Sequence, residues 1–310
     1  MVVKPLGNSG LSTPRLVLGG NVFGWNLKGE EAFRVLDRFA AAGSRMIDTA
    51  DVYSIWVPGH KGGESETLIG EWLKRRGGKG EMLIATKAGY EGGLSAAHIA
   101  QAAEASLRRL GVEAIDLYYA HKDDEATPLA ETLGAFDALV KAGKVRAIGA
   151  SNYGAARLAE ALDISERDGL ARYEALQPEY NLMARDGYEG AVQELCVARN
   201  VGVLPYFGLA SGFLTGKYRS EADFGKSVRG DRMAAYLNDK GRRVLAALDE
   251  VAAEAGATPA QVALAWLAAQ PGVTAPIASA TGVAQLEELL GVMELELKPE
   301  QIDRLNAASA

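Results

Sequence analysis

The chain has 310 residues, of which 48% are hydrophobic and 24% charged, values typical of a globular protein rather than a disordered or fibrous one. Its formal net charge of −7 at pH 7 gives no attraction to phosphate backbones or anionic lipids, so nucleic-acid and membrane binding are not expected. The single cysteine, Cys196, excludes an internal disulfide, and the N-terminus shows no signal-peptide core, so a cytoplasmic protein is expected.

Short apolar runs alternate with amphipathic stretches along the chain. In the helical stretches apolar residues share one face, as Phe33, Leu36 and Phe39 do. Ser95 and Gly111 stand where a helix N-cap and the residue after a helix end are expected. The expected elements are, in chain order, a strand over 16–19, a helix over 30–42, a strand over 46–48, a helix over 65–76, a strand over 82–86, a helix over 95–110, a strand over 115–119, a helix over 129–142, a strand over 145–149, a helix over 155–166, a strand around 176, a helix over 189–200, a strand near 206 that residues 202–204 lead into, helices over 241–255 and 259–270, a strand over 274–277 and a helix over 284–290.

This alternation amounts to about eight β/α units, the number found in a TIM barrel. A doubly wound parallel sheet is the alternative. It is disfavoured because no Gly-x-Gly-x-x-Gly follows the first strand and no change in composition marks a second domain. The opening turn over 6–11 predicts a hairpin that plugs the bottom of the barrel. We therefore expect residues 1–310 to form a single (β/α)8 barrel domain with an N-terminal β-hairpin and extra helices.

Four polar residues stand at or just after the ends of predicted barrel strands, where the reactive groups of TIM barrels lie. They are Asp48, Tyr53, Lys87 and His121. Taken one at a time, each has an ordinary structural explanation, such as a turn cap or a half-buried tyrosine. Four of them at neighbouring strand ends of one barrel are hard to explain by coincidence.

The four side chains suit the reduction of a carbonyl group. Hydride addition needs a proton for the developing alkoxide, and a free tyrosine, with a pKa of ~10, is too weak an acid at neutral pH. A nearby lysine cation stabilises the phenolate and lowers that pKa, and an aspartate paired with the lysine fixes its position. A histidine beside the phenol can orient the substrate oxygen.

The motifs around these residues resemble those of the aldo-keto reductase superfamily, in the form typical of its bacterial and potassium-channel β-subunit branches. The resemblance runs from about Leu6 to Leu290. It implies a (β/α)8 barrel, NADPH bound at the strand ends, and a catalytic tetrad of Asp48, Tyr53, Lys87 and His121. The matching stretches are Gly19-Gly20, Ile47-Asp48-Thr49-Ala50-Asp51-Val52-Tyr53, Gly63-Glu64-Ser65-Glu66, Ala85-Thr86-Lys87, Leu117-Tyr118-Tyr119-Ala120-His121, Gly149-Ala150-Ser151-Asn152, Gln177-Pro178-Glu179-Tyr180-Asn181 and Gly212-Phe213-Leu214-Thr215-Gly216-Lys217-Tyr218.

The resemblance also implies which residues bind the cofactor. Ser151, Asn152 and Gln177 would hydrogen-bond the nicotinamide carboxamide, and Tyr206 would stack on the nicotinamide ring. Leu209, Gly212 and Lys217 would line the passage for the pyrophosphate and adenosine. The adenosine end would be met by Ser279, Thr281, Gln285 and Glu288, and further cofactor contacts are expected from Gly20, Asn21, Asp48, Phe207, Gly208 and Ile277.

Two stretches depart from the pattern of many relatives. Tyr206-Phe207-Gly208-Leu209 stands where relatives have Tyr-Ser-Pro-Leu, which removes a serine that could contact phosphate. Ser279-Ala280-Thr281 offers only hydroxyls where relatives place Arg or Lys against the 2′-phosphate. Lys217 could compensate for the missing base. NADPH is therefore the expected cofactor, with NADH as the alternative.

For the substrate, the expected pocket has aromatic walls made by Trp25, Tyr53 and Trp56, with His121 beside them, and an unusually long insertion over 54–62. Such walls suit apolar or cyclic aldehydes and ketones, or the reverse oxidation of alcohols. The pattern specifies no natural substrate, direction of flux or oligomeric state, and no Cys/His cluster has metal-ligand spacing.

Other functions fit the sequence less well than a reductase does. A cofactor-sensing partner protein with vestigial catalysis, like channel β-subunits, is the alternative, but the tetrad is complete. A phosphosugar isomerase would need a catalytic glutamate and a phosphate-binding loop after the late strands, and the sequence offers no clear candidate for them. The stretch from Gly212 to Lys217 resembles a P-loop but is one residue short, and Tyr218 replaces the hydroxyl that binds Mg²⁺.

Overall fold

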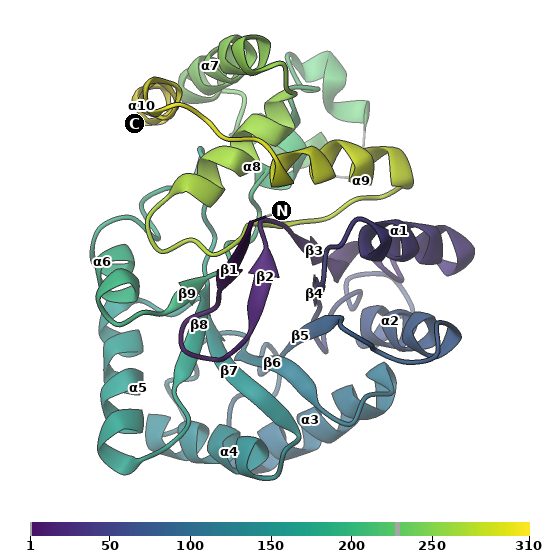
Figure 1. Cartoon of the computed structure of the whole chain (residues 1–310), viewed down its shortest axis with the longest axis vertical. Coiled ribbons are helices and arrows are strands. Elements are labelled where there is room, and N and C mark those ends of the chain that lie inside the picture. The colour runs from purple at the N-terminus through teal and green to yellow at the C-terminus, as the bar shows by residue number, and fades with distance from the viewer. Residues whose placement is uncertain (1, 227–229) are drawn as a thin grey trace.

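The computed structural model describes residues 2–226 and 230–310. Within these residues, eight parallel strands form one sheet in the order β10-β3-β4-β5-β6-β7-β8-β9, with helices packed around it (Figure 1). The strands of this sheet are β3 (Val17–Gly19), β4 (Met46–Asp48), β5 (Leu83–Ala88), β6 (Ile115–Ala120), β7 (Val145–Ser151), β8 (Tyr173–Gln177), β9 (Gly202–Val203) and β10 (Ile277–Ala278). The helices are α1 (Gly29–Ala41), α2 (Glu64–Arg75), α3 (Ala96–Leu110), α4 (Leu129–Lys141), α5 (Ala155–Asp168), α6 (Ala191–Ala198), α7 (Asp239–Ala255), α8 (Pro259–Ala269), α9 (Val283–Leu290) and α10 (Pro299–Ala308).

The two edge strands of the sheet meet, so that the sheet closes on itself. Thr274 N donates to Val203 O at 2.8 Å, and Ile277 N donates to Pro205 O at 2.9 Å. The prediction of a (β/α)8 barrel is confirmed. The last strand was expected over 274–277 but occupies Ile277–Ala278. Pro276, which has no N–H, explains why the regular ladder starts only after it.

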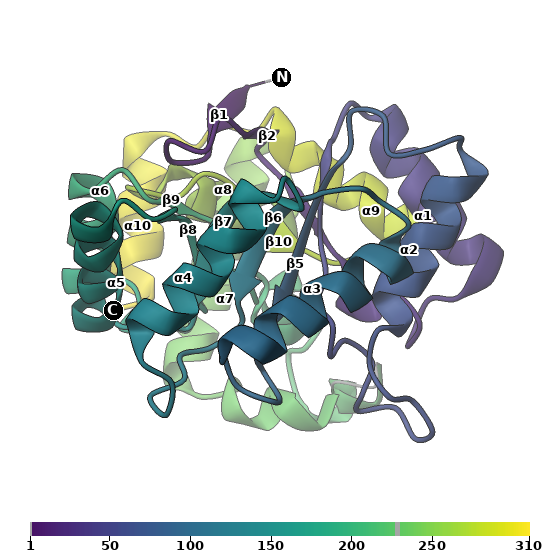
Figure 2. The ribbon, with the colours of Figure 1, turned by 90° about the horizontal axis from the view of Figure 1, so that it is seen from below.

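An antiparallel hairpin of β1 (Val3–Pro5) and β2 (Ser12–Pro14) precedes the first barrel strand, as predicted. The hairpin lies at one end of the barrel, and the segment that follows β9 lies toward the other (Figure 2). Leu6 and Leu11 of its turn are buried against Val17 and Ala275, so they fill that end of the barrel with apolar side chains. The polar site described below therefore lies at the opposite end.

Local sequence explains several of the helix ends. The side chain of Ser95 accepts a hydrogen bond from His98 N at the start of α3, and Gly111 ends that helix with φ of 64°, as expected. α8 begins with a capping box between Thr258 and Gln261. The helix expected over 189–200 is shorter because Gly190 adopts φ of 84°, which no helix interior accommodates.

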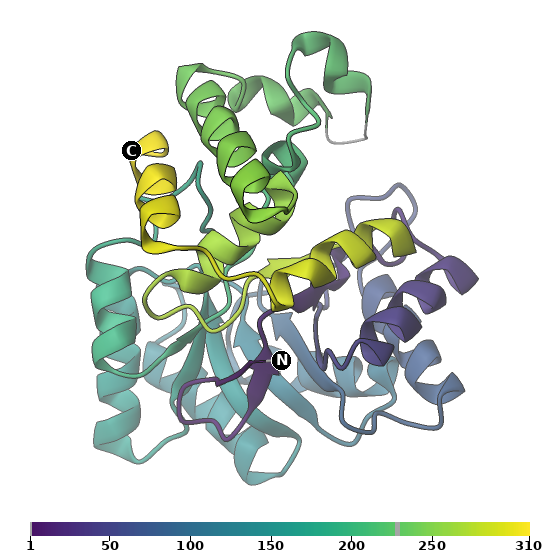
Figure 3. The same ribbon diagram turned by 45° about the horizontal axis from the view of Figure 1, so that its top comes forward.

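The stretch from Phe207 to Lys240, in which the sequence predicts no regular element, contains three short 3-10 segments among its described residues, over Ala210–Thr215, Glu221–Lys226 and Gly230–Ala235. Its residues 227–229 lie outside the described part of the chain. It leads into α7, against which α10 packs (Figure 3). Arg304 of α10 donates to Glu254 of α7 at 2.6 Å. No individual prediction covered α10. In the described residues, no helix combines the length and apolarity that a membrane crossing needs.

Candidate active site

A cavity of about 680 Å³ opens at the carboxyl ends of the parallel strands. This volume lies in the range of small-molecule and cofactor sites. Its walls come from strand ends, from the loops after them, and from α8 and α9. The lining residues are Gly19, Asn21, Val22, Asn26, Asp48, Tyr53, Trp56, Tyr90, His121, Ser151, Asn152, Gln177, Tyr206, Phe207, Gly208, Leu209, Ser211, Gly212, Thr215, Lys217, Lys226, Ala260, Ile277, Ala278, Ser279, Thr281, Gln285, Glu288 and Leu289.

The ammonium group of Lys87 is the centre of a buried hydrogen-bond network beside this cavity. Its Nζ donates to Asp48 Oδ2 at 2.7 Å, to the Thr49 carbonyl at 2.8 Å and to the Tyr53 hydroxyl at 3.0 Å. An ammonium has three N–H donors, so each donor of Lys87 has one partner. The sequence prediction that strand ends bring Asp48, Tyr53 and Lys87 together is therefore met by the geometry.

Burial and charge have opposite effects on the pKa values of Lys87 and Tyr53 in this network. Burial lowers the pKa of Lys87, but the charges of Asp48 and Tyr53 and their hydrogen bonds outweigh it and hold that pKa above its usual value. For Tyr53, burial raises the pKa, while the charge of Lys87 lowers it in part. The effect of Lys87 on the pKa of Tyr53 is predicted from the sequence, whereas the larger effect of burial is not.

A second buried ion pair fixes the strand that carries Lys87. The Glu66 carboxylate of α2 accepts a hydrogen bond from Thr86 Oγ1 at 2.6 Å and another from Arg109 Nε at 2.6 Å. Thr86 precedes Lys87 on β5, so this bond anchors the end of the strand to α2 and α3. Burial, with the charge of Glu66, also raises the pKa of Asp51 to about 7.

His121 follows β6 and lies against Tyr53, with 6.2 Å between the two ring centres. Its backbone N–H donates to Ala88 O at 2.8 Å, which places the residue at the cavity wall. Burial lowers the pKa of His121 to about 2, and the positive charges of Lys87 and Lys122 act in the same direction. The imidazole is therefore neutral at physiological pH. A neutral ring can still donate one N–H to a substrate oxygen.

We expect His121 to stay uncharged from about pH 8 to about pH 5, although free histidine titrates in that range. The unfolded chain binds this proton near pH 6.5 and the folded chain only near 2, so His121 costs the folded state no stability above pH 6.5. As the pH falls from 6.5 toward 2, protonation of the unfolded chain progressively lowers the free energy of unfolding. Histidine ring signals in NMR spectra, assigned with His121→Phe, would check this. A signal of His121 that titrates near 6.5 would contradict it.

Three further side chains with amide or hydroxyl groups line the cavity, Ser151, Asn152 and Gln177. Asn152, in the left-handed conformation with φ of 60°, donates from Nδ2 to His121 O at 3.0 Å and to Ser151 Oγ at 3.1 Å. Its Oδ1 accepts a hydrogen bond from the Tyr206 hydroxyl at 2.8 Å. Gln177 Nε2 donates to Asp48 Oδ1 at 2.8 Å. This part of the cavity wall can therefore pair with both the donor and the acceptor of an amide.

The segment after β9 offers a cradle for a diphosphate. Ala210, Ser211 and Gly212 have φ of 46°, 58° and 100°, and successive residues of this kind form concave backbone sites that attract anions. Lys217 and Lys226 line the same part of the cavity, and Lys226 Nζ donates to the Lys217 carbonyl at 2.9 Å. Two cations beside such a backbone suit a phosphorylated ligand.

Comparison with known proteins agrees with this geometry. Residues 15–310 match the aldo/keto reductase family. The chain belongs to this family. The resemblance that the motifs indicated is thereby confirmed. Within the described residues, no three His, Cys, Asp or Glu side chains are grouped so that they could hold a metal ion.

The similar curated proteins include oxidoreductases and potassium channel subunits. The chain is 34% identical to an uncharacterized oxidoreductase, YrpG, of Bacillus subtilis, covering 97% of this chain and 94% of that protein. It is 32% identical to a probable voltage-gated potassium channel subunit beta of Arabidopsis thaliana, covering 98% and 95%. It is 32% identical to the aldo-keto reductase yakc [NADP(+)] of Schizosaccharomyces pombe, covering 88% and 81%.

Aldo-keto reductases use NADP(H), and membership of this family places the chain among the oxidoreductases. The cavity fits such a cofactor because it combines amide-pairing groups, the ring of Tyr206, and a cationic end. Nearly all the residues expected to bind the cofactor line it. At the expected adenosine end, Ser279 Oγ donates to Asn21 Oδ1 at 2.6 Å, and Thr281 donates to Gln285 Oε1 at 2.9 Å.

Three of the predicted residues do not line the cavity. Gly20 is buried beside it, and its carbonyl accepts a hydrogen bond from Ser65 Oγ at 2.7 Å, so Gly19 forms the wall instead. Lys87 lies entirely below the surface and reaches the cavity only through Tyr53 and Asp48. Trp25 stands behind Trp56.

Sequence reasoning missed several residues of the wall. Tyr90 is the clearest, because its ring centre lies 5.0 Å from that of His121 and its side chain is 50% exposed. Its place shortly after the end of β5 was the available signal. The others carry no motif of their own; they are Val22, Asn26, Ser211, Thr215, Lys226, Ala260, Ala278 and Leu289.

The insertion over 54–62 brings aromatic rings to the mouth of the site. Trp56 packs edge-on against Trp25, at 5.6 Å between ring centres, and lies 6.0 Å from the Tyr53 ring. Ser54 holds the start of the insertion, because its hydroxyl donates to the Phe23 carbonyl at 2.9 Å. Trp56 remains 45% exposed, so its ring is available to a ligand.

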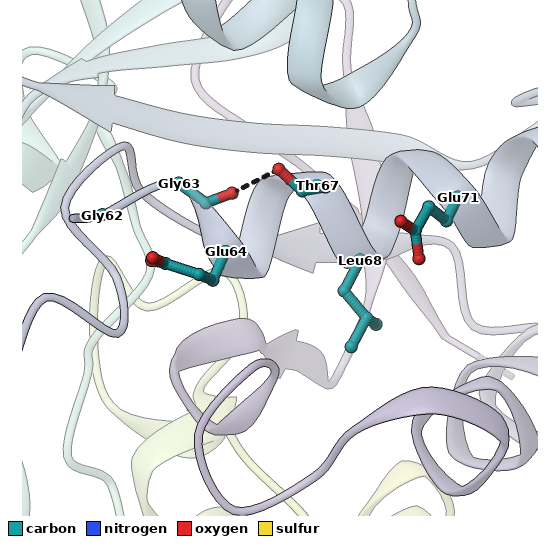
Figure 4. Close-up of a pocket in the computed structure, with 6 residues that line it drawn as sticks. All are labelled: Gly62, Gly63, Glu64, Thr67, Leu68 and Glu71. Atoms are coloured by element: carbon teal, nitrogen blue, oxygen red, sulfur yellow. Dashed lines mark hydrogen bonds between the residues drawn. The ribbon is translucent and has the colours of Figure 1, made fainter. Parts of the chain in front are cut away.

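A smaller cavity of about 280 Å³ lies at the start of α2, where Thr67 Oγ1 donates to Gly63 O (Figure 4). Glu64, Leu68 and Glu71 form its other walls. It contains none of the tetrad residues, and its two carboxylates offer an anionic ligand no partner. The larger cavity is therefore the candidate active site.

Proposed function

We propose that this aldo-keto reductase reduces aldehydes or ketones to alcohols, reversibly, with Tyr53 as the general acid. One observation carries the proposal: Tyr53 lines the cavity, and its hydroxyl accepts a hydrogen bond from the buried Lys87 ammonium at 3.0 Å. A phenol so placed can give up a proton inside a cofactor-sized cavity, and the cation stabilises the phenolate that remains.

The proposed chemistry divides between the cofactor and the chain. A nicotinamide cofactor held in this cavity would supply the hydride for the carbonyl carbon. Tyr53 transfers its phenolic proton to the carbonyl oxygen, and the O–H bond of the alcohol forms as that of the phenol breaks. Lys87, held by Asp48, stabilises the phenolate. Neutral His121 donates a hydrogen bond to the same oxygen and so fixes its orientation.

The cofactor roles expected from the sequence remain part of the proposal. Ser151, Asn152 and Gln177 would pair with the carboxamide, and Tyr206 would stack on the ring. The hydroxyl-only Ser279–Thr281 stretch keeps NADH as the alternative donor, with Lys217 and Lys226 as the cations near the phosphates. We further propose that residues 1–310 act as one domain in the cytoplasm on a small carbonyl substrate.

The aromatic rings support a proposal on substrate class. Tyr53, Trp56 and Tyr90 all line the cavity, and aromatic side chains bind flat or apolar groups well. We therefore expect apolar or cyclic aldehydes and ketones to be turned over faster than small polar ones.

A panel of such carbonyl compounds, assayed with NADPH and NADH separately, tests the function. We expect oxidation of the reduced cofactor, with a higher kcat/KM for NADPH. Cofactor binding is measured in parallel by quenching of protein fluorescence. If the cofactor binds tightly but no carbonyl is reduced, the proposal fails and the alternative, a cofactor-binding partner protein with vestigial catalysis, is favoured.

A further inference from the structure

Gln177 reaches across the mouth of the barrel to the opposite strand. The closed strand order places β8, which ends at Gln177, four positions from β4, which ends at Asp48. In a barrel of eight strands these two are diametrically opposed. Even so, Gln177 Nε2 donates to Asp48 Oδ1 at 2.8 Å, and both side chains are almost entirely buried. Two residues 129 positions apart are thus joined at the centre of the site.

With this bond, each oxygen of the Asp48 carboxylate has a hydrogen-bond partner. One oxygen, Oδ2, binds Lys87 at 2.7 Å, and the other, Oδ1, binds Gln177. A carboxylate rotates easily about its last side-chain bond, and a partner on each oxygen stops this rotation. Lys87 donates one N–H each to Asp48, to the Thr49 carbonyl and to Tyr53. A rotation of the Asp48 carboxylate would therefore turn the ammonium group as well, and with it the N–H that faces Tyr53.

We propose that Gln177 is a positioning residue that acts through Asp48 and Lys87 on the Tyr53 hydroxyl. The inference rests on the proposed function, in which Tyr53 is the proton donor. Gln177 also lines the cavity, and its amide oxygen can accept a hydrogen bond from an amide donor. A single side chain would then bind the carboxamide of the cofactor and hold the proton-donating network in its reactive geometry.

Ser151 provides a matched control for cofactor binding alone. It ends the neighbouring strand β7, lines the same cavity and is expected to bind the same carboxamide. Its hydroxyl donates to the backbone carbonyl of Gln177 at 2.9 Å and accepts a hydrogen bond from Asn152. Neither contact involves Asp48, so Ser151→Ala removes a carboxamide contact without freeing the carboxylate.

The test variant is Gln177→Met, which keeps an unbranched side chain of similar length and removes the N–H. Without that donor, more of the negative charge of Asp48 acts on Tyr53. The Lys87 ammonium is also held less firmly against the Tyr53 hydroxyl. Both effects raise the pKa of Tyr53. We expect kcat for carbonyl reduction to fall about 10-fold or more, and the inflection of the pH profile for alcohol oxidation to move to higher pH.

The titratable groups near Tyr53 are Asp48, Lys87, Tyr119, His121 and Tyr206. None of them is itself replaced in either variant, but Gln177→Met also removes the contact between Gln177 and the Tyr119 hydroxyl. A difference between the pH profiles of the two variants therefore reports on the loss of the Gln177 amide. Ser151→Ala should raise the Kd for NADPH, measured by fluorescence quenching, and leave the inflection in place. If Gln177→Met changes only the Kd, as Ser151→Ala does, the positioning role is overturned.

A cycle of unfolding measurements tests the contact without any turnover. Gln177→Met, Asp48→Asn and the double variant are unfolded by denaturant in the absence of cofactor. We expect Gln177→Met to destabilise the otherwise unchanged protein, and to do so much less when Asp48→Asn is also present, because no buried charge is then left without its donor. Independent effects would overturn the inference. If the wild type reduces no carbonyl, the proposed function fails, and the cycle still decides whether Gln177 holds Asp48.

Discussion

Replacing Tyr53 by phenylalanine is expected to lower kcat for carbonyl reduction by about 10²–10⁴-fold, the usual contribution of a positioned general acid. The Kd for NADPH should change little. The rate and the affinity respond differently because the phenolic hydroxyl supplies the proton, whereas the ring and the other walls of the cavity remain in place. Stopped-flow measurement of the hydride step, with the Kd from fluorescence quenching, checks both.

Tyr90→Phe is the matched control for this variant. Tyr90 lines the same cavity and contacts His121, and its ring lies near the cation of Lys122 instead of Lys87. Loss of its hydroxyl should leave the rate of the hydride step within a few-fold of the wild type. If Tyr53→Phe keeps a rate close to that of Tyr90→Phe, Tyr53 is not the proton donor and another group must deliver the proton.

The electrostatics of the site explain why both a cation and a neutral imidazole are needed. Burial makes the Tyr53 phenol a weaker acid, and Lys87 offsets only part of that effect in the free protein. His121 lies close to the same cation, which, together with burial, prevents its protonation. A charged imidazole would place a second buried positive charge near Lys87. The neutral ring avoids this and can still orient a substrate oxygen.

The barrel and the tetrad could be predicted because both depend on local sequence. Each strand is a short apolar run, and the polar residue after it marks the end at which parallel strands present their reactive groups. That reasoning places Asp48, Tyr53, Lys87 and His121 together without knowledge of any long-range contact. The family motifs extended it to Ser151, Asn152 and Tyr206, all of which line the cavity.

Features that depend on contacts across the barrel could not be predicted. The bond from Gln177 to Asp48 follows from barrel closure and not from either segment alone. The pKa of Tyr53 depends on how completely the ring is buried, which no motif reports. Tyr90 lies in a glycine-rich turn after β5 that resembles any surface loop, and only the fold brings its ring to His121.

Lys87→Met is expected to destabilise the protein as well as inactivate it. Both members of the Lys87–Asp48 pair are almost fully buried, so loss of the cation leaves a carboxylate without its counter-charge. Removal of one partner from a buried pair typically costs about 3–5 kcal/mol in the free energy of unfolding. The rate of reduction should fall as well, since Tyr53 loses the charge that stabilises its phenolate. Denaturant unfolding and single-turnover kinetics measure the two effects.

Lys79→Met is the control for the loss of a lysine from an ion pair. Lys79 binds the buried Asp116, but Arg146 binds the same carboxylate at 2.7 Å, so this charge keeps a partner. We expect a clearly smaller loss of stability and no loss of activity. Adding Asp48→Asn to Lys87→Met should restore much of the stability, because no buried charge remains, but not the activity, because Tyr53 still lacks its cation. A double variant that regains both would show that Lys87 serves the fold alone and would remove it from the proton-donating network.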